Sequence, residues 1–360
     1  ESGTLSYRNH LWNTIAHSSI GDMLTRPGIL PFELAKALYW LIRSPKTLWI
    51  AARDTWNART WLWQKRQFMT RLKRVHANGT RPPSPAPTRA ADIAVIMVTH
   101  NDVSEACIRS VAEAMRMSPE LRIELVVADN DSRVDPGPLV HQHIPEATIL
   151  LRNDDHGYGR SCNRAAEDIR ARYYFILNPD TVLSQPDIFG RLLRVMESHP
   201  EAGMIGPKIL YLDGRLQETC RRFPRWFMPF AQRSFLGKTR WGARYTASFV
   251  MADDSHTRTR PVDWIQGSAM FVRGEMWHLL GGFDHRYWLY FEDIDLCRRT
   301  WLAGKRVLYV PKIELKHAHG KESAKHRSML LNLLIVKEAR GHLISWAKYL
   351  WKWLGQATPD

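Results

Sequence analysis

The sequence YYFILNPDT at residues 173–181 decides the fold. Its five apolar residues are typical of a buried strand, and the turn Asn178-Pro179-Asp180 follows them directly. Pro179 stiffens this turn, so Asp180 is expected at the carboxyl end of the strand. A carboxylate beside an apolar segment is unfavourable unless a cation, a nucleotide or a proton transfer uses it. The stretch therefore predicts a ligand site at the end of a strand.

Two roles compete for Asp180. A hard divalent cation that also binds nucleotide phosphates needs only one or two carboxylates, because the phosphates supply further ligands. The alternative is an N-cap for a helix predicted over residues 187–198, but Asp187 is better placed for that role. We therefore favour a cation site at Asp180.

Strands and helices alternate on both sides of this stretch. Strands are predicted over residues 93–98, 123–128, 148–151, 173–177, 269–272 and 306–310. Helices are predicted over residues 103–117, 160–171, 187–198, 274–280 and 293–303. Such alternation, with continuous apolar strands, indicates an α/β fold whose mostly parallel sheet is covered by helices on both faces. The polar residues that follow its strands are then expected at one edge of the sheet.

Two polar segments at this edge have alternative readings. Asp129 opens the sequence Asp-Asn-Asp-Ser, which favours a turn, although an Asp in this position also suits a hydrogen bond from a base or ribose. Residues 153–163 contain two glycines ahead of a predicted helix. They fit either a loop with a helix cap or a diphosphate site at the helix N-terminus.

Two further motifs lie towards the C-terminus. Glu292 and Asp293 follow the apolar run at residues 287–291. They either favour the positive end of a helix dipole or supply a general base, because apolar surroundings raise the pKa of a carboxyl. His317 and His319 are either metal ligands or exposed histidines. The fixed order of all these motifs points to one shared site more strongly than any of them alone.

The basic charge of the chain lies near its ends. Of the net charge of +15, residues 1–76 carry +8 and residues 312–354 carry +6. A nucleic-acid groove is more naturally built into the core, so nucleic acid is not expected as a partner. Basic segments rich in Trp fit an anionic membrane surface instead.

The sequence contains neither a secretory signal nor an apolar stretch long enough to span a bilayer. We therefore predict a cytoplasmic protein that is peripheral at the inner face of the cell membrane. The four cysteines have no metal-binding spacing and are expected to be reduced and buried.

A Pro-rich segment marks the clearest boundary in the chain. We predict a basic, Trp-rich helical extension over residues 1–78, a linker over 79–91, an α/β domain over 92–320 and a basic amphipathic helical tail over 321–360. Residues 214–260 interleave arginines with aromatic residues without a clean period, and they are expected to form a long excursion over the site.

Taken together, residues 93–319 resemble the family 2 glycosyltransferases, and most of all the bacterial rhamnosyltransferase-like branch of O-antigen, capsule and cell-wall polysaccharide assembly. The resemblance rests on VTHN at 98–101, VADNDS at 127–132, residues 153–163, LNPDT at 177–181, VDWIQGSAM at 262–270, GGFD at 281–284 and YFEDIDLCR at 290–298. It implies a GT-A (Rossmann-like) fold with N- and C-terminal helical extensions, whose glycosyltransferase domain covers residues 92–320.

The resemblance implies an inverting, metal-dependent transfer of a sugar, such as rhamnose from dTDP-rhamnose, to a lipid-linked glycan in bacterial surface polysaccharide synthesis. Asp293 would be the catalytic base, and Glu292 would orient it. Asp180 and His317 would hold Mg²⁺ or Mn²⁺ on the donor diphosphate. The implied donor-binding residues are Thr99, Asn101, Asp129, Asn163 and Asn178, and the implied acceptor-side residues are Trp264 and Gly267.

Several features depart from the usual family pattern. Asn178 stands where the family's D-x-D motif begins with Asp, and His100 stands where an aromatic residue is commoner. The N-terminal helices look similar to the tail that often follows such domains, so we expect further transferase modules in tandem, with a membrane-docking arm as the alternative. A non-catalytic, membrane-associated scaffold with a degenerate transferase fold is the alternative for the whole chain. Retention of Asp180, Asp293 and His317 favours the enzyme.

Overall fold

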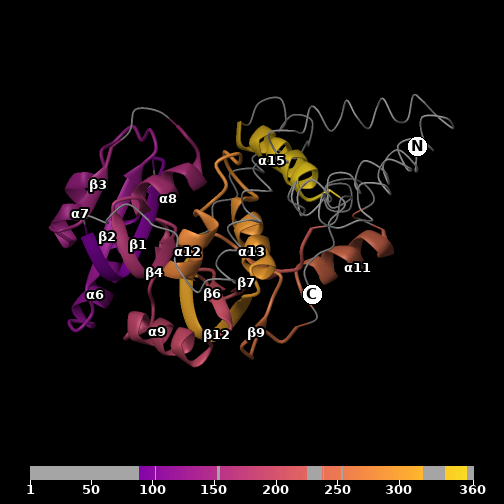
Figure 1. Ribbon diagram of the computed structural model, residues 1–360, viewed down its shortest axis with the longest axis horizontal. Coiled ribbons are helices and arrows are strands. Elements are labelled where there is room, and N and C mark those ends of the chain that lie inside the picture. Colours follow the sequence, from indigo (N-terminus) through magenta and orange to yellow (C-terminus); the bar gives the residue numbers. More distant parts are fainter. Residues whose placement is uncertain are drawn as a thin grey trace, which may run out of the picture. The chain divides into compact units, whose positions relative to one another are not determined.

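The computed structural model describes residues 89–101, 103–151, 155–224, 237, 239–252, 254–318 and 337–354. Two compact units divide the chain: one contains residues 1–83 and 352–357, and the other contains residues 84–351 and 358–360. The extension predicted over residues 1–78, most of the linker and much of the predicted tail lie outside the described residues. The second unit holds the sheet and its helices (Figure 1).

The strands are β1 (Arg89–Thr99), β2 (Ile123–Asp129), β3 (Thr148–Leu150), β4 (Ile169–Leu177), β5 (Thr181–Val182), β6 (Ala202–Leu210), β7 (Leu216–Gln217), β8 (Cys220–Arg221), β9 (Arg260–Pro261), β10 (Trp264–Ile265), β11 (Ala269–Arg273) and β12 (Arg306–His317). The helices are α6 (Glu105–Arg116), α7 (Gly137–His143), α8 (Tyr158–Ala166), α9 (Ile188–Ser198), α11 (Arg240–Phe249), α12 (Gly274–Leu280), α13 (Glu292–Leu302) and α15 (Lys337–Trp353).

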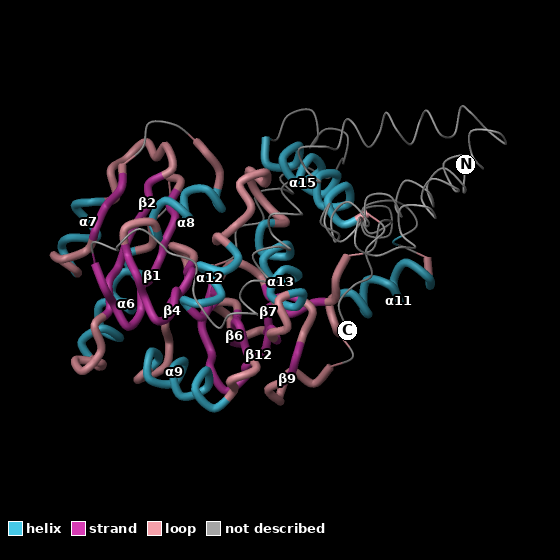
Figure 2. The backbone as a smooth tube through the Cα atoms, in the orientation of Figure 1, coloured by secondary structure: helices cyan, strands magenta, loops and turns pink. Residues whose placement is uncertain are grey.

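Among the described residues, ten strands form one mixed sheet in the order β3-β2-β1-β4-β11-β6-β12-β5, with β7 beside β6 and β9 beside β12. The first four strands are mutually parallel, and β1, β2 and β4 lie side by side in Figure 2. Strand β11 runs antiparallel to both β4 and β6, whereas β6 and β12 are parallel. The mixed, largely parallel sheet flanked by helices confirms the predicted α/β fold class.

Buried side chains fill both faces of the sheet. Ile93, Val95 and Met97 alternate along β1 and join one apolar core with residues of α6, α7 and α9. Helices α8, α12 and α13 contribute no residue to this core and pack on β1, β4, β11 and β6 from the other side. The four cysteines are all buried and free, as predicted.

Strand β6 is missing from the sequence-based prediction, although it lies near the middle of the sheet. Gly203, Gly206 and Pro207 interrupt its apolar run, and such residues normally argue against a strand. The glycines permit close packing, because a Cβ on Gly206 would lie 2.8 Å from Ile265. Pro207 sits where the register of the neighbouring β12 shifts.

Other element boundaries also differ from the prediction. The helix predicted over residues 160–171 ends at Ala166, because β4 already begins at Ile169. The last strand extends to His317, well past residue 310, and α7 was not predicted. Asp187 begins α9 in a left-handed conformation without a capping side-chain bond, and its carboxylate contacts Arg194 at 2.6 Å instead. The prediction that Asp187 caps this helix is therefore wrong.

No helix within the described ranges combines the length and the apolar character needed to cross a bilayer.

Candidate functional site

Strand register brings the predicted polar residues to one edge of the sheet. Thr99 and Asp129 end neighbouring parallel strands and are paired in register. Asn178 follows the next strand, and its backbone N–H donates to the Ser268 carbonyl at 3.0 Å. His317 pairs with Thr181 at the end of β12, just beyond Asp180. Residues distant in sequence therefore meet because the strands between them end together.

Asp129 forms the predicted turn and keeps one oxygen free for a ligand. Its Oδ2 accepts the Ser132 backbone N–H at 3.2 Å, while its buried Oδ1 has no hydrogen-bond partner among the residues that the structure describes. Buried carboxylate oxygens are almost always hydrogen-bonded, so an unpaired one suits an N–H donor of a bound ligand. Thr99 is buried beside it. Exposed Asn101 braces the adjoining loops, since its Oδ1 accepts the Arg133 backbone N–H at 2.9 Å.

A second loop is fixed to this edge by Asp155. Its Oδ1 accepts hydrogen bonds from Asn130 Nδ2 at 2.7 Å and from Trp288 Nε1 at 3.0 Å. The next turn passes through Gly157 at φ +86°, where a Cβ would lie 2.0 Å from the Trp288 carbonyl oxygen. Only glycine fits here, so this part of residues 153–163 is a tightly packed loop that ends at α8.

A chain of hydrogen bonds joins the Asn178 turn to Asp293. The Tyr158 hydroxyl is 3.1 Å from both Asn178 Oδ1 and the Gly267 carbonyl oxygen. The Gly267 backbone N–H in turn donates to Asp293 Oδ2 at 3.0 Å. Asn178 thus faces Tyr158, and the two halves of the predicted site form one connected structure.

The carboxyl groups at the start of α13 are buried and electrostatically perturbed. Burial raises the pKa of Asp293, although hydrogen bonds from Ile294 and Gly267 and the nearby positive charge of Arg221 oppose this rise. Burial, and next the charge of Asp293, hold the pKa of Glu292 well above its usual range. Glu292 Oε2 is buried, and no hydrogen-bond partner for it lies within the described part of the chain. Two adjacent carboxyls with raised pKa are characteristic of a site that handles protons.

The backbone before these carboxyls is strained. Tyr290 and Phe291 have φ values of 65° and 69°, which place two aromatic residues in the left-handed region. Bulky residues rarely adopt this conformation, and such strain clusters at functional sites. It turns the chain so that Glu292 and Asp293 start the helix directly behind Gly267.

Asp180 and His317 form the second polar centre of the site. His317 Nε2 lies 2.9 Å from Asp180 Oδ1, and His317 Nδ1 lies 2.9 Å from Gln217 Oε1. An amide oxygen on one ring nitrogen is the usual support for a histidine ligand, and a cation bound at Nε2 would take the place of the present contact with Asp180. Two ligands bound at right angles, each about 2.1 Å from an ion, lie about 3.0 Å apart. The pair therefore fits a small divalent cation.

This centre holds too few ligands to bind a cation alone. The described residues contain no group of three or more His, Cys, Asp or Glu side chains arranged to hold a metal. A Mg²⁺-type ion commonly takes one or two carboxylates and completes its shell with substrate phosphates and water. His319, the other histidine of the motif, lies outside the described residues.

Two predicted ligand residues have structural partners instead. The Asn163 amide bonds to both backbone groups of Phe283, each at 2.8 Å, so it braces the 281–284 loop. Trp264 is buried, and its indole N–H donates to the Arg222 carbonyl at 2.7 Å. The hydrogen bonds of both side chains hold neighbouring backbone in place, while Gly267 reaches Asp293 directly.

Three further residues, which were not predicted from the sequence, complete the site. Tyr158 lies between two glycines, Gln217 lies in a two-residue strand, and Arg221 lies within the arginine-rich excursion. The sequence did contain a sign of Tyr158, because a large aromatic residue stands there between Gly157 and Gly159. No local pattern pointed to Gln217 or Arg221, because their partners lie 100 and 72 positions further along the chain.

Replacing Glu292 with Gln is expected to stabilise the protein at neutral pH. A carboxyl whose folded-state pKa is raised contributes full stability below its ordinary pKa and loses it as pH rises through the raised value. Glu292→Gln removes that loss and should raise Tm at pH 8 by about 2–4 °C, or about 1 kcal/mol. Thermal unfolding at pH 5 and pH 8 checks this. A lower Tm at both pH values would mean that Glu292 is a packing residue.

Comparison with known proteins identifies the family of this chain. Residues 90–331 match the family model described as Glycosyltransferase like family 2. The chain is 30% identical over 231 residues to N-acetylglucosaminyl-diphospho-decaprenol L-rhamnosyltransferase of Mycobacterium tuberculosis, covering 59% of this chain and 73% of that protein. It is 29% identical over 172 residues to Rhamnosyltransferase WbbL of Escherichia coli, covering 45% and 61% respectively.

A solved structure is also similar. It is that of Mannosyltransferase PcManGT from Pyrobaculum calidifontis in complex with GDP-Man and Mn²⁺, with 16% identity, coverage of 79% of this chain and 71% of that chain, and a TM-score of 0.45. The family match covers most of the chain and contains every residue of the site described above. This chain therefore belongs to glycosyltransferase family 2 and is a glycosyltransferase.

Proposed function

We propose that this chain is an inverting rhamnosyltransferase that moves rhamnose from dTDP-rhamnose to a lipid-linked glycan in the synthesis of a bacterial surface polysaccharide. Two relatives are named as rhamnosyltransferases, which supports rhamnose as the transferred sugar. The name of one of them also includes N-acetylglucosaminyl-diphospho-decaprenol, which supports a lipid-linked acceptor. The observation that carries the proposal is the hydrogen-bond chain through Tyr158 and Gly267, which links the Asn178 turn to buried Asp293.

Asp293 is the base in this mechanism. Its carboxylate takes the proton of an acceptor hydroxyl while the hydroxyl oxygen attacks the anomeric carbon of the donor. The new carbon–oxygen bond forms as the bond to the diphosphate breaks on the opposite face, so the configuration inverts and the nucleoside diphosphate leaves. The Gly267 N–H holds Asp293 Oδ2 in place. Burial raises the pKa of Asp293, which strengthens it as a base.

The donor is held at the sheet edge. The free Oδ1 of Asp129 would accept an N–H of the base, with Thr99 and Asn101 beside it. Asp180 and His317 would hold Mg²⁺ or Mn²⁺, which would neutralise charge on the leaving diphosphate when bound. Gln217 keeps the His317 ring oriented for this role.

The test is a transfer assay with defined substrates. The purified chain, labelled dTDP-rhamnose, Mn²⁺ and N-acetylglucosaminyl-diphospho-polyprenol are expected to yield a labelled lipid whose new linkage is inverted, as read by NMR. UDP-glucose and GDP-mannose serve as control donors. Transfer from a control donor alone would contradict the rhamnosyl assignment, and retention of configuration would contradict the single displacement.

Three statements about partners remain predictions. Attachment to an anionic membrane and the presence of tandem transferase modules rest on the basic end segments, most of which lie outside the described residues. Co-flotation of the chain with anionic vesicles, with and without residues 1–76, measures attachment to the membrane. The absence of nucleic acid as a partner also remains a prediction. The non-catalytic scaffold is not favoured, because Asp180, Asp293 and His317 all contribute to the connected site.

A further inference from the structure

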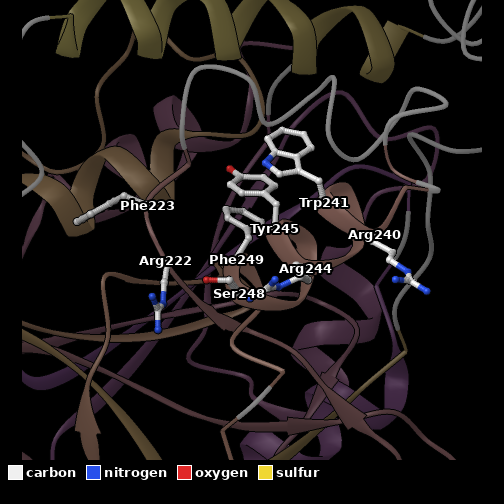
Figure 3. Close-up of a pocket in the computed structure, with 8 residues that line it drawn as sticks. All are labelled: Arg222, Phe223, Arg240, Trp241, Arg244, Tyr245, Ser248 and Phe249. Atoms are coloured by element: carbon white, nitrogen blue, oxygen red, sulfur yellow. The ribbon is translucent and has the colours of Figure 1, made fainter.

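A cavity of about 440 Å³ lies along α11, within the excursion between β8 and β9 (Figure 3). It is lined by Arg222, Phe223, Arg240, Trp241, Arg244, Tyr245, Ser248 and Phe249. Three arginines and four aromatic residues among eight lining positions are an unusual combination for a surface cavity. They provide one cationic and one apolar surface in the same space.

The apolar surface is a ladder of aromatic rings on one side of α11. Trp241, Tyr245 and Phe249 recur every fourth residue, so they lie on one helical ridge. The rings of Trp241 and Tyr245 stack at 6.1 Å, and those of Tyr245 and Phe249 stack at 6.3 Å. Exposure falls along the ladder, from 53% at Trp241 to 4% at Phe249. The ladder therefore leads from solvent into the protein.

In Figure 3, Arg222 and Arg244 lie near the lower end of this ladder, whereas the Arg240 side chain lies beside Trp241 and points away from the rings. Arg240 and Arg244 occupy the neighbouring ridge of α11, and Arg222 lies on the other wall of the cavity. None of the three forms an ion pair with any residue that the structure describes. Like charges four residues apart destabilise a helix. The Arg222 charge acts on the Asp263 carboxyl, whereas an anion in the cavity would relieve the mutual repulsion of Arg240 and Arg244.

The buried end of the ladder reaches the proposed active site. The Phe249 ring lies 6.3 Å from that of Trp264, which immediately precedes the 265–268 segment. The Arg221 guanidinium lies 5.8 Å from the Phe249 ring and 5.4 Å from the Trp264 ring. Arg221 also acts electrostatically on Asp293. A ligand held along α11 can therefore present its end towards the base.

We propose that this cavity binds the diphosphate and the first isoprene units of a lipid-linked acceptor. Arg222 and Arg244 bind the diphosphate, because guanidinium groups pair with phosphate oxygens in a bidentate manner. The Trp241–Tyr245–Phe249 ladder binds the hydrocarbon chain. This inference rests on the proposed function, since it places that function's acceptor on named residues.

Isothermal titration of the full chain with farnesyl diphosphate tests the site. Arg222→Gln and Arg244→Gln are each expected to raise Kd about tenfold, the loss of one charge-assisted hydrogen bond. Tyr245→Ala should weaken farnesyl diphosphate similarly but leave inorganic pyrophosphate unaffected. Arg109→Gln on α6, which removes an exposed arginine outside the cavity, is the matched control and should leave Kd unchanged. Titration with farnesol, which lacks the diphosphate, measures how much the hydrocarbon chain contributes to the binding affinity.

The outcomes separate this inference from the proposed function. Equal affinity of wild type and all three cavity variants for farnesyl diphosphate would overturn the site. An unchanged KM for the lipid-linked acceptor in Arg244→Gln, with transfer intact, would also overturn it while leaving the proposed function standing. If the variants bind farnesyl diphosphate more weakly as expected but wild type transfers no sugar, the binding site is supported and the proposed function is wrong.

Discussion

Asp293→Asn is expected to lower kcat for sugar transfer by about 10³-fold, within the range typical of a lost general base. The Asn carbonyl oxygen can still accept the Gly267 N–H, now 3.0 Å from Asp293 Oδ2, but the Ile294 N–H, now 2.8 Å from Oδ1, loses its acceptor. The Asn amide cannot accept the proton of the acceptor hydroxyl. Steady-state kcat and the KM for the donor, measured with wild type in parallel, check this result.

The control for this variant is binding. Because Asp293 is expected to act on the acceptor, the thermal shift produced by dTDP with Mn²⁺ should match that of wild type. Removal of the buried charge is stabilising and loss of the Ile294 hydrogen bond is destabilising, so Tm measured without ligand shows whether the variant is folded. A kcat close to wild type would exclude Asp293 as the base. A lost dTDP shift would instead mean that the substitution damages the donor site.

The pH dependence of wild type has a defined direction. Only ionised Asp293 accepts a proton, and burial raises the pKa of this carboxyl. The rate should therefore fall on acidification at a pH above about 3.9, the ordinary value for Asp. Asp293→Asn should lose this acid limb from its residual activity, because no base then titrates.

Much of the sheet was predictable because its parallel strands carry uninterrupted apolar runs. β1, β2 and β4 each contain such a run, and each was predicted within a few residues. β6 was not, because Gly203, Gly206 and Pro207 serve packing against distant elements that local pattern cannot reveal. The aromatic ladder of α11 was equally hidden, because the arginines between its rings obscured a regular four-residue spacing.

The structure brings together several residues that the sequence singled out. Asp129 ends a strand, Asp180 follows a strand and Asp293 starts a helix after an apolar run, and carboxylates beside apolar runs are informative at the level of sequence. Partners that act through long-range contacts were not singled out, as Gln217 shows with its bond to His317. Asn163 shows the converse, since its motif suggested a ligand role while its amide bonds the Phe283 backbone.

Asp180→Asn is expected to lower kcat/KM for the donor about 100-fold and to raise the Mn²⁺ concentration needed for half-maximal activity. Removing a residue that only supports a metal ligand lowers metal affinity by about 10–100-fold. Removing a direct ligand should lower it at least as much. The neutral amide keeps a hydrogen-bonding group beside His317 Nε2, now 2.9 Å from Asp180 Oδ1, so the fold should be retained. Titrating Mn²⁺ in the transfer assay measures the change.

A readout independent of turnover decides whether metal binding is what was lost. Mn²⁺ with dTDP should raise the Tm of wild type by mass action, and Asp180→Asn and His317→Gln should both lose this increase. Asp187→Asn is the matched control: it removes an exposed carboxylate paired with Arg194, at a left-handed position that Asn tolerates. An Asp180→Asn protein with the wild-type Mn²⁺ response would show that Asp180 and His317 form only an ion pair, because a true ligand cannot be neutralised without weakening the bound cation.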